Sequence, residues 1–147
     1  MTVKEFLENM EPVKNNVLDV MTMIDMSTDN IISCLFMDVV SCYTYSLEKV
    51  VHISNFKMEE NDYPYNCKGL YEVLKEEASD EYSVIIDYYL ETENGIIILT
   101  IDDFNIMKID ITKSSTRKKS AFCTIYISAD KLSNLYRFDN ENKKEKE

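Results

Sequence analysis

From Tyr82 onward the apolar side chains fall on every second residue, a spacing that places them on one face of an extended strand. The alternation runs through Tyr82, Val84, Ile86, Tyr88 and Leu90. Asn94-Gly95 is a residue pair favoured in two-residue hairpin turns, and residues 96–101 after it are again apolar. We therefore predict an antiparallel hairpin in which Leu90 faces Leu99 and Tyr88 faces Ile101.

The two faces of this hairpin differ in character. The face that carries Leu90 and Leu99 is apolar throughout and belongs against a core. The opposite face mixes apolar side chains with carboxylates: Ile85, Tyr89, Ile96 and Ile98 beside Asp87, Glu91 and Asp102. It is too apolar for a fully solvated surface and too charged for a dry core, so we expect it to face a partner.

Helical spacing dominates the beginning of the chain. Apolar residues recur at intervals of three and four over residues 3–10 and, after Pro12, over residues 17–24. Pro12 removes a backbone donor and clashes with the preceding turn, so it should kink or split this helix.

A longer helical series follows. Ser27, Thr28 and Asp29 offer N-cap oxygens immediately before apolar residues that repeat from Ile31 to Val50. This pattern predicts a long core helix, although the β-branched run Val50–Ile53 leaves a short strand as the alternative at its end. A third, short helix is predicted around Leu70–Leu74.

Two further apolar runs, over residues 106–111 and 122–127, predict a third and a fourth strand, and Ser128 should cap a final short helix. The expected fold class is α+β, with a helical N-terminal half of two or three helices on a mainly antiparallel four-stranded sheet. We expect a single domain over residues 1–139, ending in the short C-terminal helix, and a disordered charged tail over residues 140–147.

Charge is distributed unevenly along the chain. Residues 1–112 hold 22 Asp and Glu against 7 Lys and Arg, whereas residues 113–147 hold 9 basic and 5 acidic side chains. A surface this negative repels the phosphates of nucleic acids and anionic lipids, and it attracts basic proteins. We therefore expect a basic protein partner and no direct contact with nucleic acid or membrane.

Composition and the N-terminus suggest a location. Lys, Asn, Ile and Tyr are common while Gly and Pro occur twice each, a bias typical of A/T-rich genomes such as those of low-GC bacteria, their phages or large DNA viruses. The N-terminus lacks a basic segment followed by an apolar core, so we expect a cytoplasmic protein of a bacterial or virus-infected cell.

The residues that usually carry catalysis are sparse. His52 is the only histidine and lies in an apolar segment, which favours a hydrogen-bonded or partly exposed structural residue over a catalytic or metal-bound one. The four cysteines lack metal-ligand spacing and are expected to be buried thiols, with a disulfide or metal pair as the alternative: Cys34, Cys42, Cys67 and Cys123. With two glycines and no catalytic motif, we expect no catalytic residues, no metal and no cofactor.

Two other charged clusters are candidates for contacts. The acidic one is Glu76, Glu77, Asp80 and Glu81, and the basic one is Lys113, Arg117, Lys118 and Lys119. Solvated surface is the ordinary explanation of both. The alternative is a partner-facing patch for the acidic cluster, and a contact with phosphate or with an acidic partner for the basic one.

These features favour an acidic, non-enzymatic binding protein that antagonises a basic or nucleic-acid-handling partner, such as a nuclease, a toxin or a defence effector. Immunity proteins and phage or viral anti-defence inhibitors share this character, but no motif assigns the chain to either group. The predicted partner-binding residues are Ile85, Asp87, Tyr89, Glu91, Ile98 and Asp102. The alternatives are a self-associating adaptor that pairs as a homodimer, and a small-molecule-binding domain with a tyrosine-lined pocket between sheet and helix.

Overall fold

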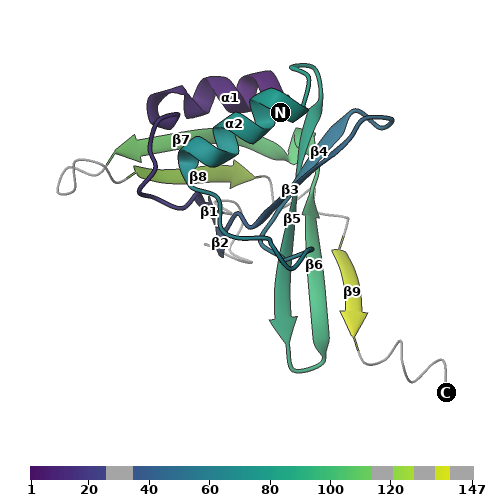
Figure 1. Cartoon of the computed structure of the whole chain (residues 1–147). Coiled ribbons are helices and arrows are strands. Elements are labelled where there is room, and N and C mark those ends of the chain that lie inside the picture. Colours follow the sequence, from purple (N-terminus) through teal and green to yellow (C-terminus); the bar gives the residue numbers. More distant parts are fainter. Residues whose placement is uncertain (26–34, 114–120, 128–134, 140–147) are drawn as a thin grey trace.

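The computed structural model describes residues 1–25, 35–113, 121–127 and 135–139 (Figure 1). These residues form two α-helices, two short 3₁₀ helices and nine strands. The helices are α1 (Val3–Met10), η1 (Glu11–Val13), α2 (Cys67–Glu77) and η2 (Asp103–Asn105). The strands are β1 (Thr22–Asp25), β2 (Leu35–Asp38), β3 (Ser41–Tyr45), β4 (Val50–Ser54), β5 (Ser83–Thr92), β6 (Gly95–Ile101), β7 (Ile106–Lys113), β8 (Ala121–Ile127) and β9 (Leu135–Asp139).

The strands form two mixed sheets. The larger has the order β3-β4-β5-β6-β9 and the smaller has the order β2-β1-β8-β7. Each sheet contains one parallel pair, β4 with β5 and β1 with β8, and its other neighbours are antiparallel. In Figure 1 the β5–β6 hairpin extends away from the helices, with β9 alongside β6.

The apolar faces of both helices and both sheets meet in one core. Thr2 caps α1 by accepting a hydrogen bond from the Glu5 N–H, and Asn66 caps α2 in the same way from the Gly69 N–H. The helices then bury side chains at helical spacing: Val3, Phe6 and Met10 from α1, and Cys67, Leu70 and Leu74 from α2. The strands contribute alternate residues to the same cluster, including Val51, Ile53, Val84, Ile86, Tyr88, Ile101, Ile109, Ile125 and Ile127.

The predicted helical N-terminal half is wrong. Residues 31–50, predicted as one long helix, contain β2 and β3 and end at the start of β4, and residues 26–34 lie outside the described part. The apolar spacing of three and four residues predicted a helix wrongly, because short strands joined by tight turns produce the same intervals. Lys49, at φ 58°, occupies the left-handed region and helps to reverse the chain from β3 into β4.

Other parts of that prediction also need correction. The segment 17–24 is not helical: no helix lies between η1 and β1, and Thr22 already belongs to β1. Val17 and Leu18, predicted as apolar helix positions, are 54% and 64% exposed. The strands predicted over residues 106–111 and 122–127 are confirmed as β7 and β8, but they belong to the second sheet rather than extending the hairpin. Both sheets are mixed, so the four-stranded antiparallel sheet is also wrong, although the α+β character holds.

The end of the chain differs as well. Residues 135–139 form β9 beside β6, where the sequence predicted the last turn of a C-terminal helix. Residues 128–134 and the predicted tail, 140–147, lie outside the described residues.

The hairpin is confirmed, with its register shifted by two residues. Thr92 pairs with Gly95, so Glu93 and Asn94 form the turn and Leu90 faces Ile97 rather than Leu99. Gly95 follows at φ 132°, a value that side chains disfavour. A shift of two preserves which side chains share a face, so the predicted division into an apolar and a mixed face stands.

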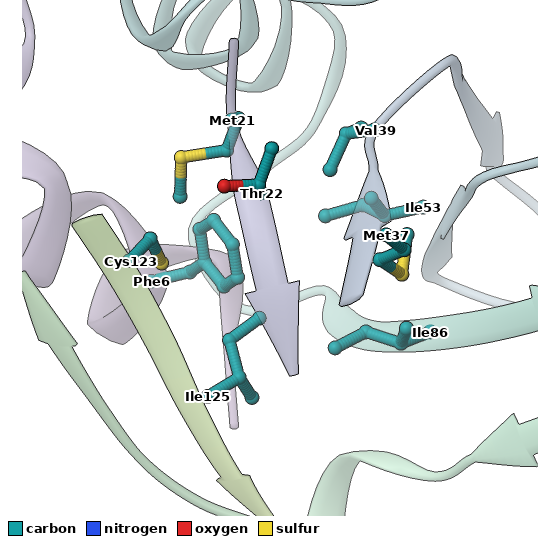
Figure 2. Close-up of a pocket in the computed structure, with 9 residues that line it drawn as sticks. All are labelled: Phe6, Met21, Thr22, Met37, Val39, Ile53, Ile86, Cys123 and Ile125. Carbon is teal, nitrogen blue, oxygen red and sulfur yellow. The ribbon is translucent and has the colours of Figure 1, made fainter. Parts of the chain in front are cut away.

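A small cavity lies between α1 and the two sheets (Figure 2). Its walls are apolar and are formed by Phe6, Met21, Thr22, Met37, Val39, Ile53, Ile86, Cys123 and Ile125. The cavity has a volume of about 10 Å³. This volume is at the lower limit for one water, and without polar partners such a cavity stays dry.

Candidate protein-binding face

The side of the larger sheet that points away from the core is the candidate site, which we call the outer face. Its side chains come from alternate positions of four strands: Tyr45 from β3, His52 from β4, Ile85, Asp87, Tyr89 and Glu91 from β5, and Ile98 and Thr100 from β6. The neighbouring residues Val51, Val84 and Ile86 point into the core. The parallel β4–β5 pairing and the antiparallel β5–β6 pairing therefore bring residues from distant parts of the chain onto one surface.

At the centre of the outer face, Asp87 joins three strands. Its Oδ2 lies 2.7 Å from Nδ1 of His52, and its Oδ1 accepts a hydrogen bond from the Thr100 hydroxyl at 3.0 Å. The His52 side chain is 29% exposed and the Asp87 side chain 15% exposed. Both oxygens of this carboxylate are thus engaged within the sheet, while the imidazole still reaches solvent.

Aromatic rings flank this hydrogen-bonded group on two sides. The Tyr45 ring meets the His52 ring edge to face, with centroids 5.2 Å apart and an interplanar angle of 84°. The Phe56 ring stacks on Tyr89 with centroids 4.5 Å apart. Asn55 also holds the Tyr89 backbone through two hydrogen bonds, so the aromatic side chains have a rigid support.

Five of the six predicted partner-binding residues lie on the outer face, Asp87 at its centre as described above. Ile85, Tyr89 and Ile98 lie on the outer face and are half-buried. Glu91 lies on the same face toward the hairpin turn and is exposed. Burial, and then the charges of Asp87 and Tyr45, raises the pKa of Tyr89, so this phenol stays protonated and can donate a hydrogen bond.

Asp102 lies elsewhere. It follows β6 and precedes η2, where its carbonyl accepts a hydrogen bond from the Asn105 N–H at 2.9 Å. The residue therefore starts a turn of 3₁₀ helix and does not extend the row of side chains on the hairpin.

The secondary acidic patch is exposed but lies away from the hairpin. Glu76 and Glu77 end α2, and Asp80 and Glu81 occupy the turn before β5, where the Asp80 carbonyl accepts a hydrogen bond from the Lys4 N–H. Of the basic cluster, Lys113 is the last residue of β7, while Arg117, Lys118 and Lys119 lie outside the described residues.

The sequence did not point to four contributors to the outer face. Tyr45 lies in the segment predicted as a long helix, His52 lies at its end, where a short strand was the alternative, and Asn55 and Phe56 follow. Only the parallel pairing of β4 with β5 brings these residues to the hairpin. Since His52 and Asp87 are 35 positions apart, no local pattern predicts their contact. The predicted hydrogen-bonded, partly exposed state of His52 is confirmed.

A second recess runs along β3. It has a volume of about 390 Å³ and is lined by Cys42, Tyr43, Thr44, Glu59, Asp62, Tyr65, Val73 and Glu77. Asp62 organises its rim by accepting hydrogen bonds from the N–H groups of Glu59 and Met58, and these bonds lower the pKa of Asp62. Burial and the neighbouring carboxylates raise the pKa of Tyr43 to about 12. The recess is thus anionic, and its acidic side chains alone do not define a ligand.

The described cysteines behave as apolar core residues. Cys42, Cys67 and Cys123 are buried free thiols, and burial is the largest cause of the raised pKa of each. Within the described ranges, no group of three or more His, Cys, Asp or Glu side chains is placed to hold a metal ion. In those ranges, too, no helix has both the length and the apolar character needed to cross a membrane.

Comparison with known proteins gives no family for this chain. No protein-family model, no curated protein and no solved structure matched it. The geometry of the outer face and the charge of the chain are therefore the evidence for its function.

Proposed function

We propose that this chain is a binding protein that docks a basic protein partner on its outer face. The observation that carries the proposal is the partial exposure of Ile85, Tyr89 and Ile98 on a rigid, hydrogen-bonded sheet surface. Apolar and aromatic side chains gathered in this way are typical of the centre of an interface.

Charge supports a basic partner. The formal net charge of the chain is −11 at pH 7, and Glu91 places an exposed carboxylate at the margin of the apolar centre. Long-range attraction then speeds encounter with a cationic protein, while the aromatic centre supplies the affinity.

Among basic partners, we favour a nuclease, a toxin or another nucleic-acid-handling effector, whose phosphate-binding surface an acidic face can occupy. In this proposal the chain acts without catalysis, as an immunity protein or an anti-defence inhibitor does, in the cytoplasm of a bacterial or virus-infected cell. The support is the polarity of the face rather than a likeness to any such protein.

The experiment compares two charge reversals. Glu91→Arg changes the outer face and Glu76→Arg changes the exposed end of α2, so both variants alter the net charge by the same amount. Each tagged variant is used to capture proteins from a lysate of the host cells at low and at high salt, and bound proteins are identified by mass spectrometry. We expect a basic protein that wild type and Glu76→Arg retain and that Glu91→Arg loses, with retention weakening as salt rises.

Two results would contradict the proposal. Equal loss in both variants would show that only overall charge matters. Recovery of the chain alone, with a dimer mass by light scattering, would instead favour the outer face as a contact between two copies of the chain.

A further inference from the structure

The orientation of His52 gives the outer face a specific chemistry. Its Nδ1 lies 2.7 Å from Asp87 Oδ2, and a carboxylate can only accept a hydrogen bond, so Nδ1 carries the proton. In a neutral imidazole the other nitrogen, Nε2, then has a free lone pair and is an acceptor. Nε2 makes no hydrogen bond with any residue that the structure describes.

Asp87 serves as the support for this acceptor. The Thr100 hydroxyl donates to its second oxygen at 3.0 Å, so the carboxylate is held on both sides and fixes the imidazole in turn. Asp87 is also less exposed than His52, at 15% against 29% of the side chain. A partner that reaches the centre of the outer face therefore meets His52 first, with the negative charge of Asp87 behind it.

Tyr45 is the aromatic neighbour of the His52 imidazole. Its ring stands nearly perpendicular to the imidazole and the residue is 49% exposed, so it offers aromatic surface beside His52. Aromatic rings attract cations, and a guanidinium group adds a flat shape that stacks on them and several N–H donors. An ammonium group lacks the flat shape.

We propose that His52 Nε2 and the Tyr45 ring bind an arginine side chain of the basic partner. The guanidinium stacks on Tyr45 and donates one N–H to Nε2. The negative charge of Asp87, on the other side of the imidazole, attracts the positive charge of the guanidinium. This inference rests on the proposed function, because the outer face must first be the docking surface.

The direct test uses three short peptides that differ in one side chain: acetyl-Gly-Arg-Gly-amide, the same peptide with lysine, and the same peptide with citrulline, which keeps the shape of arginine without its charge. Each is titrated at neutral pH into chain labelled in its histidine and tyrosine rings, and ring resonances are followed by NMR. We expect the arginine peptide to shift the His52 and Tyr45 signals, with binding about tenfold weaker for lysine and for citrulline.

Two variants and a control sharpen the test. In His52→Asn the amide N–H can still donate to Asp87, as Nδ1 does, but the Nε2 acceptor is gone. Tyr45→Leu removes the ring, and Tyr63→Leu removes a tyrosine that is 80% exposed outside the outer face. We expect His52→Asn and Tyr45→Leu to weaken the arginine peptide by about tenfold each, and Tyr63→Leu to leave its binding unchanged. Unchanged thermal midpoints would show that the variants still fold.

The inference fails if the arginine peptide does not shift His52, if lysine or citrulline binds equally well, or if a folded His52→Asn variant binds like wild type. Its failure differs from failure of the proposed function. If Glu91→Arg abolishes partner capture while His52→Asn does not, the docking face stands and only the arginine assignment is wrong.

Discussion

Asn55 and Tyr89 are joined by two hydrogen bonds just beyond the end of the β4–β5 pairing in the larger sheet. The Asn55 Nδ2 donates to the Tyr89 carbonyl at 3.0 Å, and Asn55 Oδ1 accepts from the Tyr89 N–H at 2.7 Å. The last paired residues of β4 and β5 are Ser54 and Asp87. A side-chain amide thus takes the place of backbone pairing and holds β5 at Tyr89, whose ring stacks on Phe56.

Replacing this amide should destabilise the protein. We expect Asn55→Ala to lower the free energy of unfolding by about 1–3 kcal/mol, because two partly buried backbone groups of Tyr89 lose their partner. Asn9→Ala is the matched control, since Asn9 donates only one exposed hydrogen bond, to the Glu5 carbonyl. Urea denaturation of both variants measures the difference, and equal stability would contradict this function of Asn55.

The observed hairpin register implies different effects of substitutions at Asn94 and Gly95. Gly95 has a φ of 132° and Asn94 is not among the residues with positive φ, so Gly95→Ala should destabilise the protein by about 1–2 kcal/mol while Asn94→Ala changes little. The register expected from the sequence, with Asn94-Gly95 as the turn, requires positive φ at both positions. Thermal unfolding of the two variants separates these registers, because a similar loss in both would favour the second one.

Phe6 links the helices to both sheets and should be essential for stability. It is 1% exposed and lines the small cavity together with residues of β1, β2, β4, β5 and β8. We expect Phe6→Ala to lower the free energy of unfolding by about 3–5 kcal/mol, since the cavity would grow between elements that cannot collapse. Leu47→Ala removes an apolar side chain that is 96% exposed and should change stability by less than about 0.5 kcal/mol. Comparable values for the two variants in urea would show that the sheets do not share a core.

The buried thiol of Cys42 should make stability fall at high pH. Burial, and then the Glu77 carboxylate, raises its pKa from 9.0 to about 12. Below pH 9 both the folded and the unfolded chain keep this proton, whereas above pH 9 the unfolded chain loses it first, which favours unfolding. The free energy of unfolding therefore falls by about 1.4 kcal/mol per pH unit as the pH rises from 9 toward 12.

The control for this titration is Cys42→Ala, which retains every other ionisable group. Urea unfolding of both proteins at a series of alkaline pH values should show a shallower decline for the variant. Parallel declines would mean that Cys42 ionises equally easily in the folded and unfolded chain.

Local patterns predicted those elements whose side-chain spacing has a single explanation. The alternation of Val84, Ile86 and Tyr88 and the helical spacing of Val3, Phe6 and Met10 lead directly to β5 and α1. The run from Ile31 to Val50 was ambiguous, because short strands separated by turns repeat apolar residues at intervals that also fit a helix. The chain reverses direction at Lys49, and lysine is not one of the residues that usually mark a turn. The sequence therefore lacked a turn signal at this position.

By itself, the sequence determined the two faces of the hairpin, the helices at residues 3–10 and around Leu70, and the excess of negative charge, since each depends on the order of neighbouring residues alone. Only the tertiary structure decided that β4 lies parallel to β5, and with it the contact of His52 with Asp87 and the position of Tyr45 beside them. The physical reason is that pairing between distant strands is selected by the burial of both their apolar faces together. The free energy of this burial depends on the whole core, so no pattern within a single segment of the sequence reveals it.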